Sequence, residues 1–135
     1  MNFLHLSIVL IAFSVQVRAY HTCWTFSGIV KCKEPVAGNE NMKKTIASIQ
    51  MYDKDFFDED DVMGTAKGTD ITEDGLFIVE GCGSDVVTGP DPYLAIVDYC
   101  GTSIESRNEK RSIHPIKLDA AAMSTHNKYL GEIEL

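Results

Sequence analysis

Short apolar runs, several of them alternating with polar residues, are spread along the chain and separated by turn residues. In residues 44–52 the odd and the even positions form two different faces, and this two-residue period is that of a pleated strand. Similar runs predict six more strands, from Trp24 to about Lys33, from about Met63 to Thr69, and at Leu76–Glu80, Tyr93–Tyr99, Arg111–Leu118 and Tyr129–Leu135. Seven short strands predict an all-β fold, a two-sheet antiparallel β-sandwich.

Turn and breaker residues mark where these strands end. Asp74-Gly75 supplies the left-handed position of a turn before the fourth strand, and the glycines of residues 81–84 are expected to end that strand. Pro115 places the sixth strand at an edge or a bulge. Asp119 is a suitable N-cap for a short helical turn that reaches Met123.

The amino-terminal segment differs from the rest of the chain. Residues 3–15 are an almost unbroken apolar run, and Val17-Arg18-Ala19 fits a small-x-small cleavage site before Tyr20. The run is shorter than the roughly twenty residues of a membrane-spanning helix. We therefore predict a signal peptide over residues 1–19, a secreted extracellular protein, and one domain over residues 20–135 without a transmembrane segment.

Acidic residues outnumber basic ones, 20 to 12, which gives a formal net charge of -8. This sign argues against binding to nucleic acid and against metal-free binding to anionic lipid headgroups. It is compatible with calcium, with basic partners, or with solubility alone.

All four cysteines, Cys23, Cys32, Cys82 and Cys100, follow the predicted signal peptide. An even number of cysteines in an oxidising compartment, with no C-x-x-C or Cys/His spacing, predicts two disulfides rather than a metal site. Three pairings are compatible with the sequence alone.

Six of the thirteen residues from Tyr52 to Gly64 are carboxylates, and this stretch lies between two predicted strands. The simplest interpretation is an exposed loop that its charges keep in water. The spacing of Asp53, Asp55 and Asp61 nevertheless resembles a calcium loop of the phospholipid-binding domains of synaptotagmins and conventional protein kinase C. Asp85 and Asp91 resemble the other calcium loop of that domain, in reversed order.

Carboxylates that converge from two loops can supply the oxygen ligands that calcium prefers. We keep a calcium site at these five aspartates as a second hypothesis, and we expect Asp53 and Asp61 to be exposed. Phe56 and Phe57, within the same stretch, are unusually apolar for a solvated loop. They either fold back onto the end of the sandwich or form a binding loop that inserts into a partner or a membrane surface.

Several motifs in order resemble the nematode transthyretin-like family of secreted proteins over nearly the whole chain after residue 19. The matching motifs are Gly28-x-x-x-Cys32, Pro35-x-x-Gly38, Tyr52-Asp53-x-Asp55, Asp60-Asp61-x-Met63-Gly64, Lys67-x-Thr69-Asp70, Asp74-Gly75-x-Phe77, Asp91-Pro92-Tyr93-Leu94, Asp98-x-Cys100 and Ile133-Glu134-Leu135. The resemblance implies a sandwich of transthyretin-like topology and extracellular residence. It also implies a Cys32–Cys100 disulfide, because both are family positions, and leaves Cys23 to pair with Cys82.

No catalytic motif accompanies this resemblance. A branch of the transthyretin superfamily hydrolyses 5-hydroxyisourate with a cluster of His and Arg and a carboxy-terminal Tyr-Arg-Gly-Ser, and this chain has neither. His21, His114 and His126 lie in unrelated segments, and we expect them to be ordinary surface or edge residues. We predict a non-enzymatic protein that needs no cofactor and binds an extracellular protein or a small hydrophobic or lipid ligand. The alternative is a calcium-dependent binder of anionic lipid or cell surfaces through the Asp-rich loops.

Overall fold

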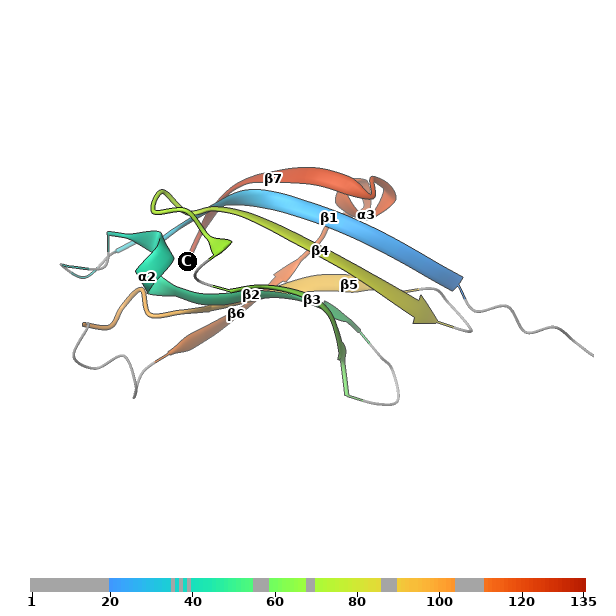
Figure 1. The fold of residues 1–135 in the computed structure, drawn as a ribbon, viewed down its shortest axis with the longest axis horizontal. Coiled ribbons are helices and arrows are strands. Elements are labelled where there is room, and N and C mark those ends of the chain that lie inside the picture. Colours follow the sequence, from blue (N-terminus) through green and yellow to red (C-terminus); the bar gives the residue numbers. More distant parts are fainter. Residues whose placement is uncertain are drawn as a thin grey trace, which may run out of the picture.

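A computed structural model describes residues 20–34, 36, 38, 40–54, 59–67, 70–85, 90–103 and 111–135. These residues form seven strands and two short helices: β1 (Tyr20–Lys31), α2 (Met42–Thr45), β2 (Ile46–Asp53), β3 (Asp61–Lys67), β4 (Leu76–Asp85), β5 (Pro92–Asp98), β6 (Ser112–Lys117), α3 (Ala120–Ser124) and β7 (Asn127–Glu134). The strands lie in two layers, with α2 at one end of the sandwich (Figure 1). None of the helices in the described part of the chain has the length and apolar character to cross a membrane.

One sheet has the strand order β4-β1-β7 and the other β3-β2-β5-β6. The predicted fold class, a two-sheet all-β sandwich of seven strands, is confirmed. Within it, β1 and β7 pair in parallel, whereas the other neighbouring strands are antiparallel. β6 lies at an edge of its sheet, as Pro115 predicts.

The core lies between the two sheets and follows from the alternation of each strand. Inward positions bury Phe26 of β1, Phe77 of β4, Ile49 of β2 and Ile96 of β5, each at most 1% exposed. Trp24, the single tryptophan, packs in the same cluster and donates from Nε1 to the carbonyl oxygen of Met123 at 3.1 Å. These four strands therefore each turn one face to the core, as the two-residue period predicts.

Two local expectations were wrong. The second strand begins at Ile46 and not at Lys44, because Lys44 and Thr45 belong to the helical turn Met42–Thr45, which buries Met42 and Thr45. β4 does not end at the glycines of residues 81–84, because it pairs with β1 as far as Tyr20↔Asp85. The expected helical turn after Asp119 is present as α3, and the Asp119 carboxylate accepts a hydrogen bond from the Ala122 amide at 2.6 Å.

The two sheets approach each other closely where β3 faces β4. A Cβ atom on Gly64 would lie 1.9 Å from the carbonyl oxygen of Glu80, and one on Gly81 would lie 2.8 Å from the carbonyl of Met63. Glycines at these two positions let the backbones meet without side chains between them. The strand pair β3 and β4 thus closes one side of the sandwich.

Two disulfides connect the strands. Cys23 on β1 bonds Cys82, which lies directly opposite on β4, and Cys32 after β1 bonds Cys100 after β5. This is the pairing that the family resemblance implies. The first disulfide joins two strands of one sheet at the surface, whereas the second joins the two sheets.

Candidate binding site at the loop end

The end of the sandwich opposite α2 gathers three segments. Asp53, the last residue of β2, pairs in register with Asp61, the first residue of β3, and with Pro92, the first of β5. The amide of Lys54 donates to the carbonyl oxygen of Asp91 at 3.0 Å. The Asp-rich loop therefore joins two strands, as expected, and the turn before β5 is hydrogen-bonded to its base.

Asp53 is buried, and the expectation that its side chain is exposed was wrong. It is 4% exposed, and its Oδ1 atom accepts a hydrogen bond from the Asp91 amide at 2.8 Å. Its position continues the inward face that Ile49 and Met51 begin, so strand geometry directs it between the sheets. A buried carboxylate requires hydrogen-bond partners, and the Asp91 amide is one of them.

The other proposed calcium ligands are only partly brought together. Asp61 and Asp91 are exposed at this end of the molecule. Asp85 lies at the end of β4 in the other sheet, opposite Tyr20. Asp55 lies outside the described residues, as do Phe56 and Phe57, the proposed binding loop.

Among the described residues, the group of three possible metal-ligating side chains within 4.8 Å of one another is His21, Cys23 and Cys82. It contains no carboxylate, and both of its sulfurs are consumed by the disulfide. The calcium site therefore stays a prediction.

Tyr93 is a site residue that the sequence did not single out. Its hydroxyl donates to Oδ2 of Asp60 at 2.6 Å, and its ring stacks on that of Tyr52 with 5.5 Å between centroids. Burial, and next the hydrogen bond and the negative charge of Asp60, raise the pKa of Tyr93 to about 12. The sequence places Tyr52 and Tyr93 on the outward faces of their strands. It does not show that the two residues lie opposite each other, which depends on the register of β2 and β5.

A cavity of about 420 Å³ opens beside this pair. Its lining combines charged, tyrosine and apolar side chains and consists of Lys54, Asp60, Asp91, Pro92, Tyr93, Pro115, Ile116, Lys117 and Leu118. In the described part of the chain neither lysine forms an ion pair, whereas Asp60 is bonded by Tyr93. Among the described residues, the cavity lining thus combines two lysines that form no ion pair with two carboxylates, Asp60 and Asp91, and with apolar side chains.

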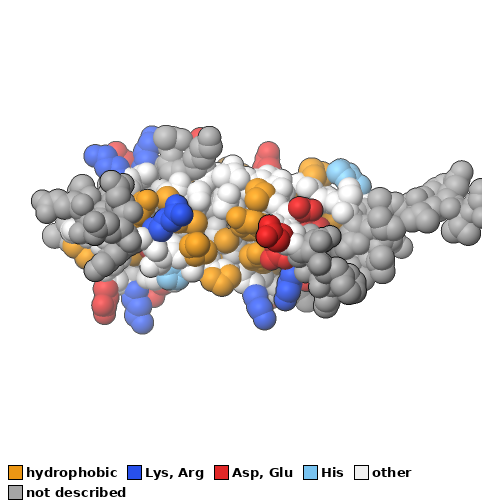
Figure 2. All heavy atoms as spheres, turned by 90° about the horizontal axis from the view of Figure 1, so that it is seen from below, with side chains coloured by type: hydrophobic (Ala, Val, Ile, Leu, Met, Phe, Trp, Pro, Cys, Tyr) orange, Lys and Arg blue, Asp and Glu red, His pale blue; other side chains and the backbone are white. Residues whose placement is uncertain are grey.

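The outer face of the four-stranded sheet continues from this cavity. Figure 2 shows that apolar side chains gather in the middle of this face, with basic and acidic side chains around them. Val62 on β3 and Ile113 on β6 are 54% and 63% exposed. Apolar side chains therefore occur both in the cavity lining and on the exposed sheet surface beside it.

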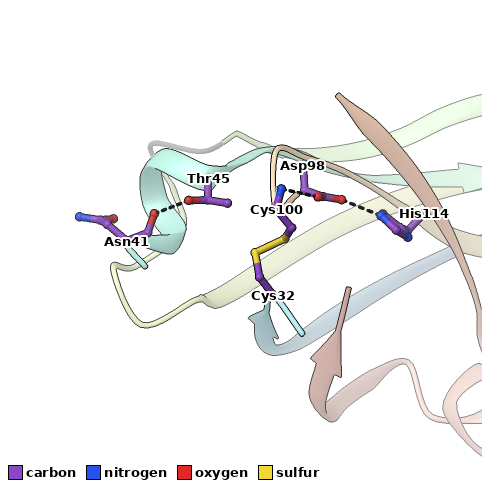
Figure 3. Close-up of a disulfide and its surroundings, with 6 residues drawn as sticks. All are labelled: Cys32, Asn41, Thr45, Asp98, Cys100 and His114. Carbon is purple, nitrogen blue, oxygen red and sulfur yellow. Dashed lines mark hydrogen bonds and ion pairs between the residues drawn. A yellow bond between two sulfur atoms is a disulfide. The ribbon is translucent and has the colours of Figure 1, made fainter. Parts of the chain in front are cut away.

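A second cavity, also of about 420 Å³, lies near the Cys32–Cys100 disulfide and is lined in part by Asp98 and His114. Asp98 is 1% exposed; its Oδ1 atom accepts from the Cys100 amide at 2.8 Å, and its Oδ2 atom lies 2.9 Å from Nε2 of His114 (Figure 3). The Asp98 Oδ2 and His114 Nε2 atoms are close enough for an ion pair, but their orientation does not make a hydrogen bond. His114 lies on the edge strand, as expected. It also has a specific carboxylate partner, Asp98, which the sequence did not predict because the two residues lie in separate segments.

Comparison with known proteins bears on the fold and the family. No curated protein matches the chain. Among solved structures, a 9R-lipoxygenase from Cyanothece PCC8801 matches with a TM-score of 0.52 and 13% identity, over 84% of this chain but only 16% of that chain. At this identity the likeness supports the sandwich fold alone. The family model described as the transthyretin-like family matches residues 27–116, which include six of the seven strands at least in part. The chain belongs to the transthyretin-like family.

Proposed function

We propose that this transthyretin-like protein is secreted and acts without catalysis, by binding a small amphipathic ligand with an anionic head in the cavity beside Tyr93. The observation that carries the proposal is the cavity lining, in which Lys54 and Lys117 stand beside Pro92, Ile116 and Leu118. Cavities of this size that combine apolar walls with a few polar groups are typical of small-molecule sites.

The charges favour an anionic head over a cationic one. The lining holds two carboxylates, Asp60 and Asp91, beside the two lysines. Asp60 already accepts a hydrogen bond from Tyr93, whereas the lysines have no ion-pair partner among the described residues. The net charge of -8 gives a free anion no long-range attraction, so the selectivity would come from short-range contacts with the lysines. An apolar body attached to the head would cover Pro115 and Leu118 and gain free energy from their burial.

Binding of the anionic apolar probe anilinonaphthalene sulfonate to the protein from Tyr20 onward tests the cavity. We expect saturable binding at one site, and Lys54→Gln and Lys117→Gln should each raise its Kd by roughly threefold to tenfold, the effect of losing about 1 kcal/mol of charge contact. Lys43→Gln, on α2 at the opposite end of β2, is the matched control and should change nothing. Equal affinity in all three variants would contradict the cavity as the site.

Secretion is tested separately. Expression of the full chain in a secreting eukaryotic cell, followed by mass spectrometry of the medium, should give an amino terminus at Tyr20. A cell-retained product that keeps residues 1–19 would contradict both cleavage and extracellular residence. The nematode origin implied by the motifs stays a prediction.

The calcium-dependent alternative keeps some support at the same end of the molecule. Asp61 and Asp91 are exposed there and belong to two segments that meet at the base of the loop. Calcium held between them would present a positive charge to anionic lipid. Asp53 is a poor ligand for this purpose, because its Oδ1 atom would have to leave the Asp91 amide.

A further inference from the structure

Two neighbouring residue pairs of β1 and β4 form a chemical cluster on the outer face of the three-stranded sheet. His21 lies opposite Ser84, and Cys23 lies opposite Cys82. Side chains on one face of a strand recur every two residues, so all four share a face. His21, Cys23 and Cys82 are exposed, and the two sulfurs and one imidazole nitrogen lie within 4.8 Å of one another.

His21 makes the disulfide asymmetric. Its Nε2 atom lies 3.8 Å from Sγ of Cys23, and its Nδ1 atom lies 2.8 Å from Oγ of Ser84. When the Ser84 hydroxyl donates to Nδ1, the ring proton is on Nε2 and faces Cys23. When the ring is protonated, both nitrogens donate, and Nε2 still faces Cys23. In these two states Cys23 is the sulfur with a proton donor beside it, whereas a neutral ring with its proton on Nδ1 donates to Ser84 and has no proton on Nε2.

We propose that Cys23–Cys82 is a thiol-exchange site, at which a low-molecular-weight thiolate attacks Sγ of Cys82 and Cys23 leaves. A new S–S bond forms between the attacking sulfur and Cys82 while the Cys23–Cys82 bond breaks. The electron pair of the broken bond stays on the Cys23 sulfur, which takes the proton from Nε2 of His21, and solvent returns a proton to the ring. A second thiolate can then remove the first as a small disulfide, so that two thiols are oxidised and the two cysteines are reduced.

Leaving-group chemistry supplies the direction of attack. In thiol–disulfide exchange the sulfur that is better stabilised as a thiolate leaves faster, and a neighbouring imidazole provides this stabilisation. His21 contacts Cys23, so Cys82 is the sulfur that is attacked. Ser84 is a positioning residue, because it fixes the orientation of the His21 ring.

The second disulfide lacks these features. Cys100 is only 8% exposed, and Cys32 is half-buried and packed against the core. Cys82 is exposed, so an external thiolate reaches it more readily than it reaches either sulfur of the Cys32–Cys100 bond. Exchange should be selective for one of the two disulfides, and the site is independent of the ligand cavity, because it lies on the other sheet.

The test exposes the folded protein to glutathione and traps new thiols quickly with an alkylating reagent. Peptide mass mapping should find glutathione on Cys82 and the alkyl group on Cys23 of the same chain, with this arrangement preferred over the reverse by roughly tenfold. His21→Asn should slow exchange and bring the two arrangements close to equal. Ser84→Ala should shift the ratio in the same direction but less, and His126→Asn, at another exposed histidine, should leave rate and ratio unchanged.

Three results would overturn the proposal: glutathione found equally on both cysteines of the native chain, a native ratio in the His21→Asn chain, or opening of Cys32–Cys100 as fast as Cys23–Cys82. The ratio separates a chemical role of His21 from a structural one, because loosened packing alone would accelerate attack at both sulfurs. Failure here leaves the ligand cavity untouched, since the probe-binding measurement does not involve either cysteine.

Discussion

The carboxylate of Asp53 and the amide of Asp91 are joined by a hydrogen bond of 2.8 Å, although they are separated by 38 positions in the sequence. A second hydrogen bond joins the same two segments, because the Lys54 amide donates to the carbonyl oxygen of Asp91 at 3.0 Å. The base of the Asp-rich loop and the turn before β5 therefore behave as one structural unit. The same unit carries three residues of the cavity lining, Lys54, Asp91 and Pro92.

Removing the Asp53 carboxylate should destabilise the fold. We expect Asp53→Ala to lower the free energy of unfolding by about 1 to 3 kcal/mol, because the Asp91 amide loses its acceptor. Asp53→Asn, which keeps an acceptor oxygen, should lose less. Urea unfolding followed by Trp24 fluorescence measures both, and Asp91→Asn, an exposed side chain, is the control. An unfolding midpoint that is the same in all four proteins would contradict a structural role of Asp53.

Calcium at millimolar concentration should raise the melting temperature if the exposed carboxylates bind it. Stabilisation of about 0.4 to 1.4 kcal/mol follows when calcium is present at about one to ten times its Kd. Magnesium should do less, because its small octahedral shell fits such loops poorly. The diagnostic variant is Asp61→Asn with Asp91→Asn, since both side chains are exposed and the buried Asp53 is left intact. If calcium up to about 10 mM does not change the melting temperature, the calcium-site hypothesis is rejected and the loop is simply solvated.

The raised pKa of Tyr93 predicts a stability change at alkaline pH. Below pH 10.0 the phenol carries its proton in both states, so the contribution of its folded environment is fully present. Between pH 10.0 and about 12 the unfolded chain loses the proton more readily than the folded chain, so stability falls as the pH rises. This part of the decline should be absent in Tyr93→Phe and retained in Tyr129→Phe, the control at an exposed tyrosine. Ultraviolet titration should assign the last phenolate to Tyr93; an early one would be inconsistent with burial beside Asp60.

The closed side of the sandwich should tolerate no side chain at Gly64. A Cβ atom there would meet the backbone of Glu80, so Gly64→Ala requires the two sheets to separate at that point. We expect a loss of about 1 to 3 kcal/mol, typical of overpacking, and a similar but smaller loss for Gly81→Ala. Gly101→Ala is the control, because a Cβ atom at that residue would meet nothing within 4 Å. Thermal unfolding of the three variants should give this order, and a wild-type midpoint for Gly64→Ala would mean that the sheets are not in backbone contact.

The ion pair between Asp98 and His114 predicts that two substitutions of His114 differ in their cost to stability. His114→Ala leaves the buried Oδ2 atom of Asp98 without its partner and should cost about 1 to 3 kcal/mol. His114→Gln keeps a donor at this position and should recover part of the loss. Denaturant unfolding of both proteins makes the comparison. If His114→Ala and His114→Gln are equally stable, the imidazole contributes no specific contact to Asp98.

Local patterns in the sequence were enough to predict the sandwich. Alternation and turn residues together identified the strands, because one side of a strand faces the core and the other faces water, as in β2. Alternation does not report what a strand pairs with, and the misplaced end of β4 has that origin. The glycines of residues 81–84 are typical of a strand end, yet β1 continues to pair opposite them. β3 lies so close to Gly81 that no side chain would fit there.

The site was less accessible to sequence reasoning, because its contacts join distant segments. Asp53 lies in a run of carboxylates, and composition alone describes the whole run as solvated; only the parity of its position on β2 indicated burial. Tyr93 and Asp60 are separated by 33 positions, and His114 and Asp98 lie on neighbouring strands whose register no local pattern specifies. The Cys23–Cys82 pairing followed by elimination, once the family resemblance had implied the Cys32–Cys100 bond, and no local pattern places these two residues opposite each other on β1 and β4.

The order of the cysteines along the chain determines how the protein responds to proteolysis. The bonds Cys23–Cys82 and Cys32–Cys100 interleave, so a protease that cuts anywhere between residues 33 and 81 leaves two fragments that are held together by both disulfides. Such a nicked molecule keeps its mass on a non-reducing gel and separates only after reduction. A cut between residues 101 and 111 has the opposite result, because β6 and β7 follow the last cysteine and are retained by strand pairing alone. Fragment patterns with and without reductant would thus distinguish the covalently enclosed part of the domain from its carboxy-terminal strands.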